Sequence, residues 1–262
     1  MKSASGKSDG WLESVKTIVW ALVIAGIFRT LFFQPFWIPS GSMKETLLIG
    51  DFLFVNKMAY GYSRWSCPFG LCPFPGRLLG SEPERGDIVV FRHPVSGADY
   101  IKRVIGLPGD TVQMRDGILH LNGDPVPQEP DGAFTETYAR QGSGGQYPRC
   151  ENAPVGQGGD CTKSRYTETL PGGREYSVLN IEDGGFADDT PLYTVPEGHF
   201  FFMGDNRDNS VDSRAPRNIG GVGFVPFDHL IGRADRVIFS SAGASMLAFW
   251  TWRSDRFFHR LQ

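Results

Sequence analysis

A long apolar run near the N-terminus constrains this chain more than any other feature. From Thr17 to Phe33 nearly every residue is apolar, and Arg29 and Thr30 are the interruptions. With its flanks the run covers residues 11–33, which would form a helix about 34 Å long at 1.5 Å per residue. Because that length spans a bilayer, the sequence predicts one transmembrane helix at 11–33, preceded by a polar tail at 1–10.

A cleaved signal peptide is the alternative to an anchor. Residues 23–25 read Val-Ile-Ala and resemble a small-residue cleavage site, but the apolar run continues past them to Phe33, which favours an uncleaved anchor. The lysines that precede the run are Lys2, Lys7 and Lys16. By the positive-inside rule they place residues 1–10 in the cytoplasm and residues 34–262 outside it, although Arg29 on the other side weakens this signal.

Beyond the anchor, the residue pattern predicts a mostly β protein. The 33 glycines and 18 prolines suit short strands with many turns. We expect strands at 51–56, 87–92, 111–115, 118–121, 198–204 and 236–240, and residues 116–117 read Asp-Gly, a hairpin turn. The predicted fold class is therefore mostly β, an antiparallel β domain carried on one N-terminal transmembrane helix.

Two further segments have their own character. Residues 131–196 are rich in Gly, Thr and charge, and they are predicted to form a smaller inserted region with short strands at 165–170 and 175–179. Residues 246–262 combine aromatic residues with arginines. This tail is predicted to be an amphipathic helix, either lying on a membrane surface or packed on the domain.

Charge and cysteine content restrict the partners and the compartment. The formal net charge is −3 and no basic stripe appears, which argues against nucleic acid as a partner. The four cysteines form two local pairs, Cys67 with Cys72 and Cys150 with Cys161. Close pairs outside the cytosol favour disulfides. A zinc site is disfavoured because the spacing is not C-x-x-C and no histidine is near, while other connectivities and free thiols stay open.

Two segments carry residues that could react together. Residues 39–43 read Pro-Ser-Gly-Ser-Met and present Ser42 on a tight turn, and Lys102 stands in the apolar strand at 100–110. A serine hydroxyl is a poor nucleophile until a base takes its proton. A lysine can be that base if burial lowers its pKa from about 10.4 toward neutrality. A turn serine and a solvated strand lysine are the alternatives, and only the fold can bring the two residues together.

These segments belong to an ordered series of blocks that resembles the bacterial type I signal peptidases, membrane-bound endopeptidases that remove signal peptides from exported proteins. The blocks are residues 36–43, 47–57, 86–91, 99–110 and 204–214, and they follow an anchor. The resemblance implies that Ser42 is the nucleophile and Lys102 its general base. It also implies that the Ser40 hydroxyl and the Ser42 backbone N–H form the oxyanion hole.

The last block supplies supporting residues in this resemblance. Ser210 is expected to hydrogen-bond the lysine amine, and Asp212 with Arg214 to form an ion pair near the site. A calcium loop is rejected for residues 205–216, because the third, sixth and twelfth positions are Arg207, Ser210 and Pro216. We therefore expect neither a metal nor a cofactor.

The resemblance also implies how a substrate binds. The peptide is expected to add as an extended strand between residues 36–40 and 99–102, with its small Ala-x-Ala residues in shallow apolar pockets. The residues expected to bind it are Phe36, Ile38, Pro39, Met43, Asp99 and Ile101. The expected partners are preprotein signal peptides, the lipid of the cytoplasmic membrane and the secretion translocon. The expected location is that membrane, as a single-pass protein with its catalytic domain on the extracytoplasmic side.

Three other interpretations remain. A Ser-His-Asp triad stays open, since triads assemble in the fold, although no histidine lies in a catalytic motif. Self-cleaving repressor-type proteases also use serine with lysine, but they are soluble and carry a DNA-binding helical region. A non-catalytic scaffold that binds signal peptides is a different class of function, and a Ser42→Ala comparison would separate it from the peptidase.

Overall fold

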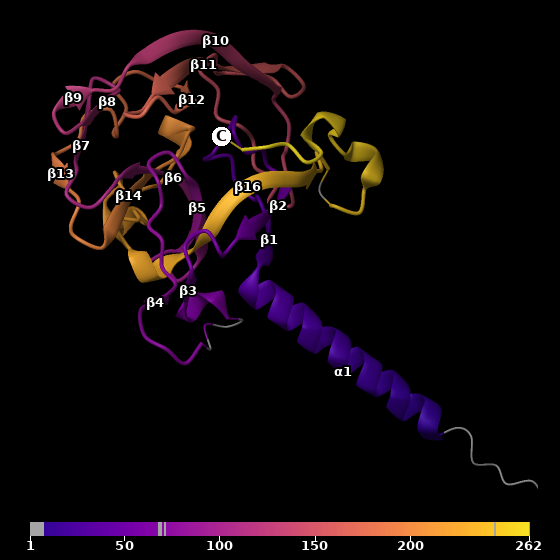
Figure 1. The fold of residues 1–262 in the computed structure, drawn as a ribbon. Helices are drawn as coiled ribbons and strands as arrows, with labels where there is room; N and C mark the ends of the chain where they lie inside the picture. Colours follow the sequence, from indigo (N-terminus) through magenta and orange to yellow (C-terminus); the bar gives the residue numbers. More distant parts are fainter. Residues whose placement is uncertain (1–7, 68–69, 71, 244, 262) are drawn as a thin grey trace, which may run out of the picture.

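The computed structural model describes residues 8–67, 70, 72–243 and 245–261. One long helix, α1 (Ser8–Leu31), projects away from a domain built of strands (Figure 1). Its segment Gly10–Leu31 is long and apolar enough to cross a membrane. Side chains such as Trp20 and Leu22 are 66% and 68% exposed. Such a helix needs apolar surroundings, which supports the predicted membrane anchor.

The helix ends earlier than predicted. It stops at Leu31, and Phe33 already begins strand β1 (Phe33–Trp37), where it pairs with Asn56. Pro35 explains the boundary, because a proline disfavours the helical conformation in the residue before it and has no N–H to donate. The aromatic residues after the anchor therefore form the edge of a sheet.

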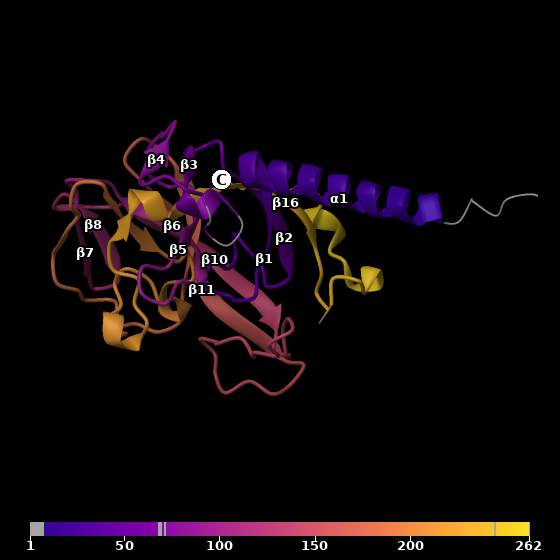
Figure 2. The same cartoon turned by 90° about the horizontal axis from the view of Figure 1, so that it is seen from below.

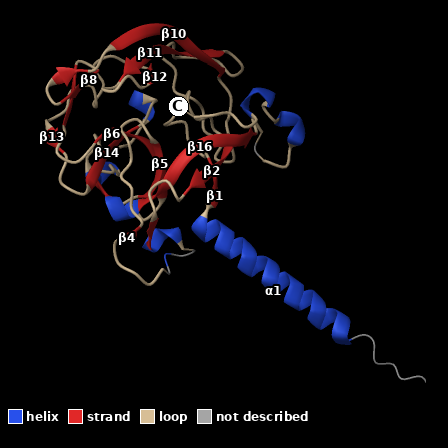
Figure 3. Ribbon diagram, viewed as in Figure 1, coloured by secondary structure: helices blue, strands red, loops and turns tan. Residues whose placement is uncertain are grey.

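The domain is mostly antiparallel β, as predicted (Figure 3). Its main sheet has seven strands in the order β1-β2-β16-β5-β6-β14-β15. Besides β1 these strands are β2 (Asp51–Asn56), β5 (Ile88–Arg92), β6 (Asp99–Gly106), β14 (His199–Met203), β15 (Val225–Pro226) and β16 (Leu230–Ser240). The central strand β5 reads Ile-Val-Val-Phe-Arg and is almost wholly buried, as an apolar run without alternation requires.

Smaller sheets surround the main one. Strands β10 (Gln128–Thr137), β11 (Asp160–Thr169) and β12 (Glu175–Asn180) form a sheet of three, which begins just before the stretch 131–196 predicted as an inserted region. Figure 2 shows the β10–β11 hairpin projecting from the domain. A sheet of four contains β13 (Tyr193–Thr194), β7 (Thr111–Arg115), β8 (Ile118–Leu121) and β9 (Asp124–Pro125), and a sheet of two pairs β3 (Tyr62–Ser63) with β4 (Arg77–Leu78).

The predicted β7–β8 hairpin is confirmed residue for residue. Its turn residues Asp116 and Gly117 have φ values of 48° and 74°. Positive φ at both central positions is the geometry of the two-residue hairpin turn that Asp-Gly favours. The Asp-Gly turn residues were sufficient to predict this hairpin, because its two strands are neighbours in the sequence.

Near the C-terminus, one predicted strand is present but longer than expected, and one predicted helix is wrong. The last strand was expected at 236–240, but β16 covers Leu230–Ser240 and lies between β2 and β5. The tail was expected to be helical, but it contains only short 3₁₀ turns at Phe249–Thr251 and Ser254–Arg256. Its backbone instead bonds to the end of β16, through the bridges Arg236–Arg260 and Ser241–Trp252. Those tertiary bonds replace the internal bonds that a helix would need.

The cysteine prediction is confirmed. Cys67 bonds to Cys72, and Cys150 bonds to Cys161. Within the described ranges, no cluster of three or more His, Cys, Asp or Glu side chains is arranged to hold a metal ion. The local disulfide pairing is the one that the spacing favoured.

Candidate active site

The structure brings Ser42 and Lys102 into direct contact. Lys102 Nζ donates a hydrogen bond to Ser42 Oγ at 2.6 Å, across 60 residues of sequence. Ser42 is 8% exposed and Lys102 is 4% exposed. A lysine amine aimed at a buried serine hydroxyl is the arrangement that proton transfer between them requires.

The turn that presents Ser42 is held on both sides. Ile38 and Met43 flank it and are buried in one hydrophobic cluster. Asn206 N–H donates to Ser42 O at 3.1 Å, and Asn206 Nδ2 donates to Gly41 O at 2.9 Å. The backbone on either side of the serine is therefore fixed by packing and by hydrogen bonds.

Strand β6 delivers Lys102 from the middle of the main sheet. Lys102 pairs with Val89 of β5. Burial lowers the pKa of Lys102 to about 8, and the nearby carboxylates of Asp212 and Asp205 oppose the shift. Desolvation disfavours the charged ammonium, so the neutral amine becomes accessible near neutral pH.

The neighbouring residue Arg103 points to the other side of β6 and was not singled out in the sequence. Its guanidinium donates to both carboxylate oxygens of Asp205, at 2.9 and 2.8 Å. Thr46 Oγ1 also donates to Asp205, at 2.6 Å. The strand alternation offered a signal for this pair, because an arginine on a second buried face needs a carboxylate partner.

The loop after β14 contributes the remaining predicted residues. Asp212 and Arg214 form the predicted ion pair, with Arg214 Nε and Nη2 at 3.0 and 2.9 Å from its two oxygens. Gly204 N–H also donates to Asp212, at 2.9 Å. Although burial raises the pKa of Asp212, the charge and hydrogen bonds of Arg214, together with Gly204 and Ser210, lower it below its usual value.

Ser210 lies at the site, close to Gly204. Its hydroxyl is buried and makes no hydrogen bond of good geometry within the described part of the chain, although it helps to lower the pKa of Asp212. Ser210 and the Ser42 backbone can both lie close to residue 204 because that residue is a glycine. A Cβ on Gly204 would lie 2.3 Å from Ser210 Oγ and 2.5 Å from Ser42 O. The hydrogen bond from Ser210 to the lysine amine stays a prediction.

A small cavity adjoins the reacting pair. Its volume is about 40 Å³. The residues that line it are Phe36, Trp37, Ile38, Pro39, Val90, Asp99, Tyr100 and Ile101. They include all the predicted substrate-binding residues except Met43, which is 1% exposed in the core. Ser40 is exposed beside this region.

Comparison with known proteins decides the family. Residues 11–239 match the family described as "Signal peptidase, peptidase S26". The chain belongs to this signal peptidase family. It is accordingly a serine peptidase, which is a hydrolase, and its apolar N-terminal helix is consistent with membrane anchoring.

Individual signal peptidases match over most of their length. Signal peptidase I of Rickettsia canadensis (strain McKiel) is 38% identical over 235 residues, covering 86% of this chain and 79% of the relative. Signal peptidase I of Rickettsia typhi (strain Wilmington) is 38% identical over 238 residues, covering 87% and 80%. A signal peptidase I crystal structure from Enterococcus faecalis V583 is 28% identical over 58% of this chain and 97% of its own, with a TM-score of 0.30. A TM-score of that size does not establish a shared arrangement of elements.

Among the described residues, no hydrogen bond joins a histidine to Ser42. The rings of four of the five histidines hydrogen-bond backbone carbonyls: His93 to Gly220 O, His120 to Ile118 O, His199 to Glu197 O and His229 to Arg92 O. A serine–histidine pair therefore has no support in the described residues, whereas the serine–lysine pair has direct geometric support.

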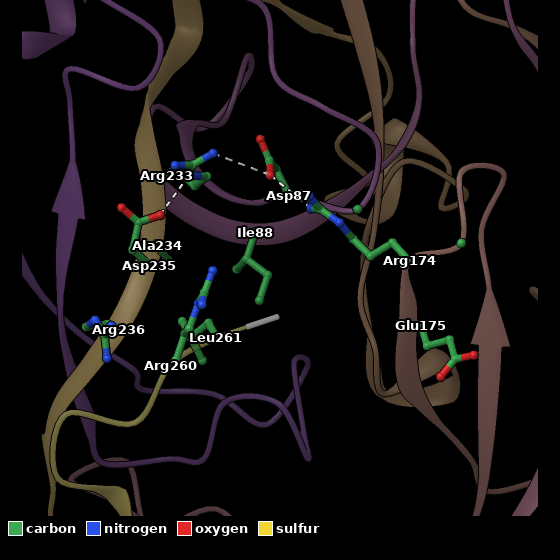
Figure 4. Close-up of a pocket in the computed structure, with 12 residues that line it drawn as sticks. Asp87, Ile88, Arg174, Glu175, Arg233, Ala234, Asp235, Arg236, Arg260 and Leu261 are labelled. Carbon is green, nitrogen blue, oxygen red and sulfur yellow. Dashed lines mark hydrogen bonds and ion pairs between the residues drawn. The ribbon is translucent and has the colours of Figure 1, made fainter.

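A larger cavity of about 860 Å³ lies elsewhere on the signal peptidase domain (Figure 4). It is lined largely by charged side chains. Among them, Asp87 Oδ1 accepts a hydrogen bond from Arg174 Nη1 at 3.0 Å. Its described lining contains no serine, threonine, cysteine or lysine. Size does not mark the catalytic centre here, because proteolysis by a serine needs the nucleophile and its base.

Proposed function

We propose that this chain removes N-terminal signal peptides from exported preproteins, with Ser42 as nucleophile and Lys102 as general base. The observation that carries the proposal is the 2.6 Å contact between Lys102 Nζ and Ser42 Oγ. Family membership supplies the reaction class, and this contact supplies the two groups that the reaction requires.

Lys102 must be neutral to accept the serine proton. With a pKa of about 8, roughly a tenth of the amines are neutral at pH 7 and about half at pH 8. An unperturbed lysine at about 10.4 would be neutral in well under one molecule in a thousand at pH 7. The buried position therefore raises the population of the reactive form by more than a hundredfold, as about 2.4 pKa units imply.

The reaction proceeds through an acyl-enzyme. Neutral Lys102 takes the Ser42 proton as Ser42 Oγ attacks the scissile carbonyl, and the oxyanion accepts hydrogen bonds from the Ser40 hydroxyl and the Ser42 N–H. The lysine ammonium then protonates the leaving amine, which is the N-terminus of the mature protein. Lys102 next activates a water that hydrolyses the ester, releasing the signal peptide carboxylate and restoring Ser42.

The strand edges near the site suit an extended substrate. β1 is the outermost strand of the main sheet and pairs with β2, and β14 pairs with β6 only from Arg103 onward. Among the described residues, no strand pairs with residues 99–102 of β6 on that side, so this edge is open to an added strand. A peptide added as a strand uses such edges, and the cavity of about 40 Å³ admits a small side chain such as alanine.

We infer the membrane placement from the anchor and the disulfides. We place α1 in the cytoplasmic membrane as a single span, with residues 1–10 inside and the domain outside. The disulfides Cys67–Cys72 and Cys150–Cys161 favour the outer side, because disulfides persist in oxidising compartments. Signal peptides, membrane lipid and the translocon are the partners in this arrangement.

The decisive experiment compares the full-length protein in detergent with its Ser42→Ala and Lys102→Ala variants on a preprotein with an Ala-x-Ala site. We expect the wild type to cut after that site and both variants to be inactive. Cutting by either variant at the wild-type rate would refute the Ser42–Lys102 assignment. A folded wild type that binds the preprotein without cutting it would favour the scaffold function.

A further inference from the structure

A buried ionic cluster lies beside the nucleophile turn and joins it to the β10–β11 hairpin. Glu136 Oε2 of β10 lies 2.5 Å from Lys44 Nζ, and Glu136 Oε1 accepts a hydrogen bond from Lys163 Nζ of β11. Gln141 accepts from Lys44 Nζ at 2.7 Å and donates to Glu136 Oε2 at 2.6 Å. We call these four residues the Glu136 cluster. Its members are 92 and more residues from Lys44 along the chain, so it is a tertiary contact.

The carboxylate of Glu136 is the counter-charge for both ammonium groups of the Glu136 cluster, those of Lys44 and Lys163. Lys44 is 3% exposed and Lys163 is 1% exposed. Both amines form their ion pair with Glu136 in the described residues. Burial lowers the pKa of Lys44, and Glu136 opposes that shift. Removing the carboxylate would leave two buried ammonium groups without a counter-charge, which is strongly unfavourable.

Lys44 lies directly over the turn that presents Ser42. A Cβ built on Gly41 would be 3.2 Å from Lys44 Cε and 3.4 Å from its Cδ, so the lysine alkyl chain covers Gly41. Lys44 N–H also donates to Gly41 O at 3.2 Å. Asn206 holds the same turn through Gly41 O and Ser42 O. The turn is therefore confined between Asn206 and the alkyl chain of Lys44.

The hairpin presents Glu136 in a defined position. Glu136 pairs with Cys161 and Phe134 pairs with Lys163, so these four side chains share one face of the β10–β11 pair. The Cys150–Cys161 disulfide ties the same point of β11 to the loop that follows β10. A carboxylate mounted on a paired and cross-linked hairpin is well suited to hold a partner in place.

We propose that Glu136 is a positioning residue for the catalytic serine: it keeps the Lys44 side chain folded over Gly41 and thereby fixes Ser42 relative to Lys102. The proposal rests on the proposed function, since it takes Ser42 and Lys102 as the reacting groups. It gives the β10–β11 hairpin an indirect part in catalysis, through Lys44 and the turn that carries Ser42.

The test is steady-state kinetics of the full-length protein on an Ala-x-Ala preprotein. In Glu136→Gln we expect kcat to fall about tenfold, within the range of up to about a hundredfold that a 1 Å misplacement costs. We expect KM to change less than about twofold, because the strand edges that bind the peptide are untouched. Glu129→Gln is the matched control, since Glu129 is an exposed carboxylate of the same strand.

Rescue separates positioning from general stability. Adding Lys44→Met to Glu136→Gln keeps an alkyl chain over Gly41 and removes the uncompensated charge beside the serine turn, while that of Lys163 remains. Because only the Lys44 chain covers Gly41, kcat should return to within about threefold of the wild type. If Glu136→Gln keeps the wild-type kcat, or if Lys44→Met does not rescue it, the proposal is overturned. If Glu136→Gln does not fold, the double variant Glu136→Gln with Lys163→Met replaces it in this comparison. The double variant removes the Lys163 charge and leaves the Lys44 amine without its carboxylate.

The same assay distinguishes the two proposals. Ser42→Ala and Lys102→Ala are measured beside the Glu136 variants. Loss of activity in both, with full activity in Glu136→Gln, would remove the positioning role and leave the proposed function intact. Activity in Ser42→Ala would remove the proposed function itself.

Discussion

Arg103 and Asp205 form a fully buried, two-pronged ion pair directly behind the reacting residues. Their hydrogen bonds are 2.9 and 2.8 Å long, and the side chains are 0% and 1% exposed. Because Arg103 follows Lys102 in β6 and Asp205 precedes Asn206, the pair connects the strand that carries the base to the loop that holds the serine turn. It therefore links the two halves of the site.

Breaking this pair should destabilise the fold strongly. In Asp205→Asn we expect the free energy of unfolding to fall by about 3–5 kcal/mol, because the buried ion pair with Arg103 loses its carboxylate. Denaturant titration of the full-length protein in detergent measures this. Glu182→Gln is the control, since Glu182 and Arg149 form a pair that is 55% and 45% exposed, and surface pairs contribute only about 0–1 kcal/mol. Equal effects in the two variants would contradict the expectation.

Activity should depend on the protonation of Lys102. Since its pKa is lowered to about 8, kcat/KM should fall about tenfold per pH unit below that value and level off above it. The sign follows from the base role, because the ammonium cannot accept the Ser42 proton. A profile that stays flat from about pH 5 to 9 would exclude Lys102 as the base. Lys102→Arg should be inactive throughout, as guanidinium does not deprotonate in this range.

Gly204 should tolerate no side chain. Because a Cβ there would lie 2.5 Å from Ser42 O and 2.3 Å from Ser210 Oγ, Gly204→Ala must displace the serine turn or the Ser210 loop. We expect kcat/KM to drop by about a hundredfold, the cost of a 1 Å misplacement at the reacting atoms. Gly156→Ala is the control, since a Cβ at Gly156 meets nothing within 4 Å. Wild-type kinetics in Gly204→Ala would show that the loop adapts freely.

The hairpin disulfide should contribute measurably to stability. Cys150 and Cys161 close a loop with a sequence separation of 11 residues. Restricting the unfolded chain by a loop of that length stabilises the fold by about 3 kcal/mol. Replacing both cysteines by serine should lower the free energy of unfolding by this amount. The corresponding Cys67 and Cys72 variant closes a shorter loop, separated by 5 residues, and should lose less, about 2 kcal/mol.

Local and periodic signals in the sequence determined much of this protein. The apolar run predicted a helix that could cross a membrane, the Asp116-Gly117 turn predicted its hairpin, and the cysteine spacing predicted both disulfides. Each depends on neighbours in the chain, so no long-range packing is needed to recognise it. Ser42 and Lys102 were identified in the same way, from short motifs and their family resemblance.

Only the tertiary structure decided the remainder. Pro35 and the pairing of β1 with β2 ended the anchor at Leu31, and bonds to β16 kept the tail from forming a helix. The partners Arg103–Asp205 and Lys44–Glu136 are separated by 102 and 92 residues. Strand alternation can mark Arg103 as a buried charge, but no local pattern identifies its partner, because a buried charge takes whichever partner the folded chain brings within reach. The 2.6 Å distance between Lys102 and Ser42 likewise exists only once β6 and the serine turn have packed together.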